Sequence, residues 1–385
     1  MNRANRFAAA CLAALPLAFI AAPAAAQTGW WSPSLSIGAV YDDNTTASSN
    51  AADDVILRVT PAVEGGWFGP RGSLTALHTF DLERYKEHTS FNDAQVRRRT
   101  AIDGDYRLSE RLDLSASAST AATDAPGDLI PELGLELGRV DAERHAADAQ
   151  VGYRLSERTT ATMSAGWARD DVADGTEITT LLGAIGGTYV ASARHTWTAD
   201  YVNRRYEFGA QSPIDAHIGL LGWVTALSER ATLTVKAGPR YTDGETSPEV
   251  FVGTSWEMPT SNLSANYSRT QSTVIGQSGL ADSQTLWLTY RNQLNTAWSV
   301  LVTPGWSRLE RGGREAEVVR ALIEVGYLMN RNLSFRGSYQ FSRQDGRLES
   351  PFPLQINRNV VYVGATWDFI PPPAATQSTT TRRRP

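Results

Sequence analysis

The feature that most constrains this chain is a period-two alternation of apolar and polar residues that recurs along almost its whole length. Residues 361–369, for example, alternate Val, Val, Ala, Trp and Phe with Tyr, Gly, Thr and Asp. Successive side chains of a β-strand point to opposite faces, so this pattern predicts strands with one apolar and one polar face. Helical periodicity of any length is absent from the sequence. The sequence therefore predicts an all-β protein.

Two kinds of connection separate the predicted strands, and they alternate along the chain. The short kind is a tight polar turn, and the tetrapeptide Leu-Ser-Glu-Arg provides three of these turns, at 108–111, 155–158 and 227–230. The long kind is rich in Gly, Asp, Ser and Pro, as at 42–54 and 120–132. One short turn per hairpin is the pattern of an antiparallel meander. Counting both kinds of connection predicts about 18 strands.

The length of the predicted strands separates a membrane barrel from a soluble sandwich. Strands of soluble proteins usually have about five or six residues, whereas a tilted transmembrane strand needs about 9 to 11. The strands predicted here reach about ten residues or more, and their second face is too polar for the dry core of a sandwich. A mean hydropathy of −0.30 excludes a polytopic helical membrane protein. We therefore predict a transmembrane antiparallel up-and-down β-barrel of about 18 strands, with short periplasmic turns and longer extracellular loops.

The N-terminal segment, residues 1–26, has the three parts of a cleaved signal peptide. Arg3 and Arg6 precede an apolar stretch at 7–22, and the small residues 24–26 form a cleavage site before Gln27. The alternative, a membrane anchor, fits less well because the apolar stretch is short for a spanning helix. The single cysteine, Cys11, lies in this segment, which excludes a disulfide framework and a cysteine-based zinc site in the exported chain.

The predicted domain order is a signal peptide at 1–26, a barrel at 27–369 and a disordered periplasmic tail at 370–385. The tail begins with a run of prolines at 371–373 and ends near three arginines at 382–384. It is either a solvated extension or a contact for an acidic partner such as an inner-membrane complex.

Aromatic residues gather near both ends of the predicted strands, as expected for the two interfaces of a bilayer. The alternative, aromatics scattered along strands, predicts no such clustering. The predicted girdle residues are Tyr41, Trp67, Trp167, Trp256, Trp298, Trp306, Trp367 and Phe369.

The sequence offers little chemistry for catalysis. The five histidines lack metal-ligand spacing, and no nucleophile-elbow, zinc-protease or phosphate-binding motif is present. His88 and Ser90 stand two residues apart as in outer-membrane phospholipases, but their flanking residues do not fit that family. A formal net charge of −5 does not suggest nucleic-acid binding. We expect no enzyme activity, no cofactor, no metal site and no nucleic-acid partner.

If the apolar face points outward, the charged side chains of the polar face line a lumen. Opposite charges on neighbouring strands either set a transverse field that orients solutes or form ion pairs that stiffen the wall. Trp287, Tyr362 and Tyr206 also face inward, either to stack on sugar rings or for packing. Loops 42–54 and 120–132 are expected to fold in as a restriction. The pore-lining candidates are Arg58, Asp81, Glu83, Arg97, Arg99, Asp103, Asp200, Arg204, Lys236, Arg240, Arg291, Arg320, Glu324 and Arg336.

The alternating strands and the final strand 361–369 resemble those of Gram-negative outer-membrane β-barrels, whose last strand ends in an aromatic residue. More narrowly, Gly-Ala-Val-Tyr-Asp-Asp-Asn at 38–44 and Leu-Arg-Val-Thr-Pro at 57–61 are similar to barrels found with exopolysaccharide export systems. The resemblance implies localisation in the cell outer membrane. It also implies contacts with lipid, lipopolysaccharide, the barrel assembly machinery, and polysaccharide or export-complex proteins. One departure is that Phe369 is not the last residue.

Together these observations predict a passive pore or conduit for hydrophilic solutes, with polysaccharide export as the preferred cargo hypothesis. The alternative is a structural or adhesion barrel whose lumen is plugged and whose extracellular loops bind a partner. Two segments, 137–150 and 214–227, are ambiguous because apolar residues fall on both faces, and a one-residue slip would exchange their inward and outward sets.

Overall fold

The computed structural model describes residues 28–173, 175–348 and 354–371. The predicted signal peptide and all but the first two residues of the predicted tail lie outside these ranges. Eighteen β-strands and two short 3-10 helices account for most of the described chain. Among the residues described, no helix is long and apolar enough to cross a membrane.

The strands follow one another in chain order with two helical turns between them. The elements are β1 (Thr28–Asp42), β2 (Asp54–Gly69), β3 (Gly72–Tyr85), η1 (Thr89–Phe91), β4 (Asp93–Ser109), β5 (Leu112–Thr123), η2 (Pro126–Leu129), β6 (Ala142–Arg154), β7 (Thr159–Val172), β8 (Ile178–Val190), β9 (His195–Phe208), β10 (Ile214–Ser228), β11 (Ala231–Thr242), β12 (Glu245–Glu257), β13 (Ser261–Thr273), β14 (Leu280–Gln293), β15 (Trp298–Arg311), β16 (Arg314–Leu328), β17 (Leu333–Gly346) and β18 (Gln355–Asp368).

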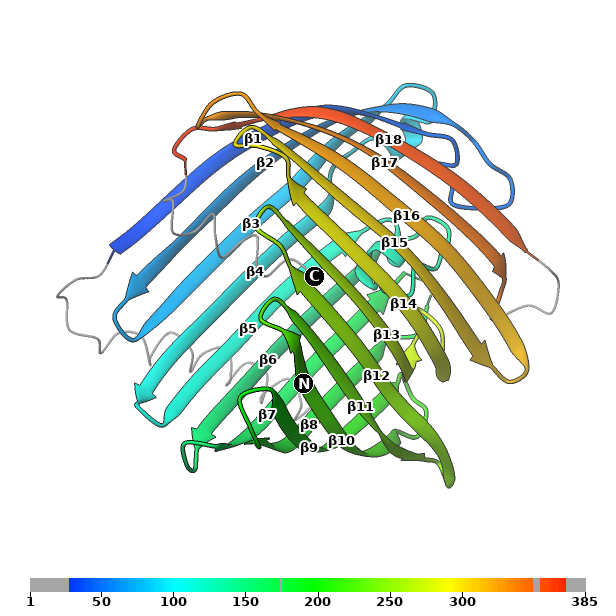
Figure 1. Ribbon diagram of the computed structural model, residues 1–385. Coiled ribbons are helices and arrows are strands. Elements are labelled where there is room, and N and C mark those ends of the chain that lie inside the picture. The colour runs from blue at the N-terminus through cyan, green and yellow to red at the C-terminus, as the bar shows by residue number, and fades with distance from the viewer. Residues whose placement is uncertain (1–27, 174, 349–353, 372–385) are drawn as a thin grey trace.

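The strands form one closed antiparallel barrel, which confirms the predicted architecture. Each strand pairs with its neighbours in the sequence, and β1 pairs with both β2 and β18, so the sheet has no free edge. At the seam Ile37 of β1 stands opposite Ala365 of β18. Figure 1 shows the strands strongly tilted around the barrel, as closure of a sheet requires.

The two faces of the barrel wall differ as the alternation predicts. Residues directly opposite in an antiparallel pair share a face, so the register assigns every strand position to the lumen or the outside. Leu221 and Val363 point outward and are 74% and 64% exposed. One exception is Phe251, which shares the inner face with Lys236. Another is His78, which lies outside and bonds Thr100 Oγ1 through its Nδ1 at 2.9 Å.

The register also settles the two ambiguous segments. In β10, Ile218 points into the lumen and is fully buried, whereas Leu221 points outward. Residues 137–141 are not strand, because β6 begins at Ala142. The predicted loop at 120–132 is shifted as well: residues 120–123 still belong to β5, so the loop spans 124–141.

The connections at one end of the barrel are all short, and the long connections all lie at the other end, where β11–β12 and β15–β16 are nevertheless joined by the two-residue turns Asp243-Gly244 and Gly312-Gly313. The β2–β3 turn has only two residues between Gly69 and Gly72, whereas the β5–β6 connection runs from residue 124 to residue 141. We call these the turn end and the loop end. The largest buried apolar cluster lies at the loop end, where residues of long connections pack against inward side chains of the wall.

Candidate functional site

The β5–β6 segment, residues 124–141, does not extend away from the barrel but folds into its lumen. Leu133 and Leu135 are buried, and they pack in one cluster with Leu309 of β15 and Val318 of β16. In Figure 1 this segment lies inside the barrel, between the two walls. Removing these leucines from water explains the fold, because burying one leucine contributes roughly 1.5–3 kcal/mol.

Polar side chains of β14, β15 and β17 form hydrogen bonds with the backbone of the same segment. Ser307 Oγ donates to the carbonyl of Leu133 at 2.6 Å, and Trp287 Nε1 donates to the carbonyl of Glu132 at 3.2 Å. The Glu136 amide donates to Gln344 Oε1 at 2.8 Å. Buried backbone groups need such partners. The inner wall of β14–β17 is therefore built to receive this segment.

Glu136 forms an ionic anchor within this contact. Its carboxylate accepts a hydrogen bond from Ser342 Oγ at 2.9 Å and lies 3.3 Å from Arg358 Nη1. Arg358 also pairs with Asp42 of β1, with Nη2 2.6 Å from Oδ2. The Glu136 and Arg358 side chains are only 8% and 10% exposed, so water screens their attraction poorly. The segment is thus tied to the β18–β1 seam of the barrel.

Arg139, near the C-terminal end of the segment, binds residues of β3 and of the β1–β2 loop. Its guanidinium donates to the Tyr85 hydroxyl at 2.8 Å and to the Thr45 carbonyl at 3.2 Å, and it pairs with Asp124. It also lies 4.5 Å from the centre of the Phe91 ring. Because Thr45 is buried here, the β1–β2 loop joins the inward-folded layer, as expected for 42–54.

A second inward connection comes from the β13–β14 loop, which reaches the β7–β8 loop. Thr176 and Gly276 form an isolated β-bridge, with the Thr176 amide 3.0 Å from the Gly276 carbonyl. Gly276 has φ of 74°, a conformation that favours glycine. Val274 and Ile275 of this loop are buried against the apolar clusters that also hold the β5–β6 segment. The two connections together narrow the lumen at the loop end.

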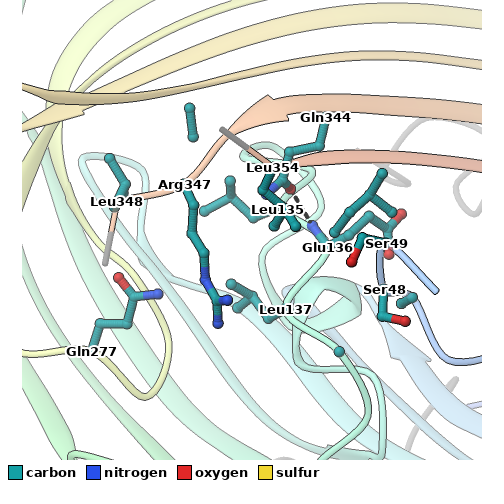
Figure 2. A pocket seen from close by; sticks show the side chains of 14 residues that line it. Ser48, Ser49, Leu135, Glu136, Leu137, Gln277, Gln344, Arg347, Leu348 and Leu354 are labelled. Carbon is teal, nitrogen blue, oxygen red and sulfur yellow. Dashed lines mark hydrogen bonds between the residues drawn. The ribbon is translucent and has the colours of Figure 1, made fainter. Parts of the chain in front are cut away.

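A cavity of about 140 Å³ remains between these connections and the wall. Figure 2 shows it with Gln344 and Glu136 joined by their hydrogen bond, and with Ser48, Gln277 and Arg347 around it. Its lining mixes polar groups with leucines.

The register places all fourteen pore-lining candidates on the inner face, but most are engaged in ion pairs. Arg58 lies 2.7 Å from Glu83 and 3.5 Å from Asp81. Arg97 pairs with Asp124 of the inward-folded segment and with Asp128. The other candidates in ion pairs form Asp200–Lys236, Arg204–Glu249, Arg240–Glu249, Arg240–Asp282 and Glu324–Arg336.

These contacts favour the wall-stiffening alternative for β3 and β4. Asp81 and Glu83 are neutralised by Arg58 of β2, and Arg97 turns to the inward-folded segment. Among the residues that the structure describes, Arg99 has no ion-pair partner. The sequence predicts a transverse electric field between the carboxylates Asp81 and Glu83 and the arginines of β4. The ion pairs weaken this field, because paired opposite charges have little field at a distance.

The three inward aromatics serve packing in this structure. Trp287 holds the Glu132 carbonyl, and Tyr206 is buried. Tyr362 lies close to the backbone of Gly38 and Gly364, where an added Cβ would collide with its ring at Gly38 and with its hydroxyl oxygen at Gly364.

The girdle candidates lie on the outer surface near strand ends. Tyr41 and Trp167 lie toward the loop end, whereas Trp256, Trp298 and Trp367 lie toward the turn end and are exposed. Trp67, Trp306 and Phe369 are placed likewise by the register or by position next to β18. Their role at a bilayer interface stays a prediction.

The structure gives His88 a carboxylate partner, Asp54. His88 Nδ1 bonds Asp54 Oδ2 at 3.0 Å, and its amide donates to the same carboxylate at 2.8 Å. This arrangement fastens the β3–β4 connection to the start of β2. In the part of the chain that the structure describes, no group of three or more His, Cys, Asp or Glu side chains is placed to hold a metal ion.

Sequence reasoning missed the residues that anchor the inward-folded segment: Asp42, Glu136, Arg139 and Arg358. A usable signal was present, since Leu133, Leu135 and Leu137 are apolar at alternate positions directly after the loop predicted at 120–132. A water-exposed loop has no reason for such a run, whereas a segment packed on an inner wall does.

No protein-family model and no curated protein matches this sequence. Solved structures with a similar course of the chain include Pseudomonas aeruginosa OpdO, with a TM-score of 0.47 and 13% identity, covering 89% of this chain and 97% of that one. Pseudomonas aeruginosa OccK7 (OpdD) has a TM-score of 0.47 and 10% identity, covering 89% and 99%. Acinetobacter baumannii OccAB4 has a TM-score of 0.45 and 10% identity, covering 90% and 100%.

Similarity at this level carries no argument about what this chain binds or transports. The barrel architecture rests on the strand pairing described above. Nothing in these comparisons supports the narrower resemblance to exopolysaccharide-export barrels.

Proposed function

We propose that this protein is an outer-membrane channel through which hydrophilic solutes diffuse passively, and that the β5–β6 segment sets its width. The observation that carries the proposal is the combination of two faces in one closed wall. The outer face exposes large apolar side chains, and the inner face carries charged and small polar ones. Only a wall between lipid and water suits both faces.

The outer face argues for a bilayer. Leu221, Val363 and Met163 are more than 60% exposed, and each would gain roughly 1.5–3 kcal/mol on transfer out of water. The closed sheet satisfies its backbone hydrogen bonds internally, which a spanning structure requires. With a cleaved signal peptide, the compartment that fits such a barrel is the outer membrane of a Gram-negative cell. Lipid, lipopolysaccharide and the barrel assembly machinery are then the proposed partners.

The inner face suggests the chemistry of the cargo. Inward arginines, carboxylates and serines keep the lumen wet, so small hydrophilic solutes fit best. Polysaccharide export remains a narrower proposal that rests on the short motifs at 38–44 and 57–61 alone. The inward-folded segment counts against a wide polymer, because it crosses the lumen and is anchored on both sides. Nothing in this mechanism requires a catalytic step or a cofactor.

A second candidate is the adhesion or structural barrel with a plugged lumen. The observation that favours it is the apolar cluster at the loop end, in which Leu133, Leu135 and Val274 pack against the wall. A dry cluster of this kind would close the mouth if it filled the whole section of the lumen.

Replacing residues 126–139 by a short Gly-Ser linker separates the two candidates. We expect proteoliposomes with the wild type to admit small sugars, and those with the shortened variant to admit larger ones at higher rates. A plugged adhesion barrel predicts no uptake by the wild type. The refolded state of both proteins is checked by heat-dependent migration in gels, so that an unfolded sample is not taken for a closed one.

A further inference from the structure

Most ionised side chains of the lumen are neutralised by a neighbour. The lumen-facing pairs include Asp200–Lys236 at 2.8 Å, Arg204–Glu249 at 3.0 Å and Arg144–Asp170 at 2.9 Å. Their charges stabilise the wall and leave little for a solute.

Three ionised side chains of one wall sector differ from these pairs. Arg99 and Asp103 on β4 and Asp148 on β6 are exposed to the lumen. Within the described part of the chain, none of the three makes a hydrogen bond or an ion pair in the structure. Arg99 and Asp103 therefore have no direct partner in the wall, and Asp148 has only the longer-range attraction of Arg144.

Their positions on the wall follow from the register. Asp103 and Asp148 both stand opposite Ser117 of β5, so two strand spacings, about 10 Å, separate their backbones. Arg99 precedes Asp103 by four residues, about 13 Å along the same strand. The positions between are small, since Ala101 and Ser119 occupy the intervening row. The sector is therefore a strip of the inner wall with a positive end at Arg99 and a negative end at Asp103 and Asp148. Small side chains lie between the two ends.

The wall also makes room for one of the carboxylates. Asp148 stands opposite Gly166 of β7, and a Cβ at that glycine would lie 2.6 Å from Asp148 Oδ1. A larger residue at 166 would displace the carboxylate. Arg144, which shares the row of Arg99, is already paired with Asp170 and adds little to the positive end.

We propose that this strip binds zwitterionic solutes with separated charges, such as short peptides, as they pass through the lumen. The solute's ammonium group lies at Asp103 and Asp148, and its carboxylate lies at Arg99. An extended chain spans at most about 3.5 Å per residue, so two or three residues bridge charges whose side chains reach toward each other across the strip. Each exposed pair is weak, which lets the solute leave again. The inference rests on the proposed channel function and names a class of solute for it.

Single-channel recording with triglycine as the probe tests the inference. We expect triglycine to interrupt the current of the wild type more strongly than its N-acetylated anion or its amidated cation. Arg99→Gln, and the double variant of Asp103→Asn with Asp148→Asn, should each weaken the apparent binding of triglycine about two- to fivefold, the factor that an exposed ion pair supplies. Gly166→Ala should act in the same direction without removing a charge.

Arg98→Gln is the matched control, because Arg98 adjoins Arg99 but points outside, where it pairs with Glu143. Binding of triglycine should stay unchanged in this variant. Conductance with equal binding of all three probes, or equal effects of the Arg98 and Arg99 variants, would overturn the inference. Absence of conductance in folded wild type would instead overturn the proposed channel function.

Discussion

Removal of the Glu136 carboxylate should release the β5–β6 segment from the seam and widen the channel. In Glu136→Ala, the segment loses the hydrogen bond from Ser342 and the ion pair with Arg358. Arg358 keeps its ion pair with Asp42, so the variant leaves no unpaired buried charge on this arginine. The eighteen-strand ladder is untouched, and the stability of the barrel itself should hardly change.

The size of the effect can be worked from these contacts. A hydrogen bond to a charged group contributes about 1.5–3 kcal/mol, and Glu136 makes one hydrogen bond and one longer ionic contact through its side chain. We expect the docked position to lose about 2–4 kcal/mol. At about 1.4 kcal/mol per factor of ten, the ratio of docked to undocked segment falls roughly 30- to 700-fold.

The assay combines single-channel conductance with hydrogen exchange of the segment. Faster exchange at residues 131–140 together with higher or more frequent large conductance levels is the expected result. Glu132→Ala is the matched control, because this exposed glutamate contributes only its backbone carbonyl to the anchor. Faster exchange in Glu136→Ala with an unchanged conductance would refute the reasoning that this segment sets the width.

Three further changes test the wall and its anchors. Val363→Arg places a charge on the outer face and should destabilise the barrel in lipid by about 2–4 kcal/mol, measured by urea unfolding in vesicles, whereas the lumen substitution Gln340→Arg should cost much less. Gly364→Ala should displace the Tyr362 ring and cost about 1–3 kcal/mol in the same assay; no change would contradict the close approach. Arg139→Met should speed proteolysis of the β5–β6 segment, and equal cleavage rates would count against the anchor.

The barrel could be predicted from the sequence because its cause is local. The alternation at 361–369 can be interpreted without knowledge of distant contacts. Short turns such as 108–111 mark the points at which the chain reverses. The inner and outer sets follow from the same pattern wherever one face is apolar. The alternation did not assign the faces of 214–227. Ile218 is apolar although it points inward, because that part of the inner wall is buried.

The restriction could be expected only in outline. The anchor between Glu136 and Arg358 joins positions that are 222 residues apart and meet only after the barrel closes. Whether a lumen charge is free or paired depends on the same closure, so Asp81 and Asp103 look alike in the sequence but differ in the structure. Only the apolar run at 133–137 hinted that this connection is covered.

The most direct test of the proposed channel is the conductance of the purified, folded wild type in planar bilayers. We expect discrete, voltage-stable current steps in the absence of any added ligand, with a size that rises when residues 126–139 are replaced by a short linker. A folded barrel that passes no current, with or without these residues, would contradict the central claim that its lumen is a channel for hydrophilic solutes.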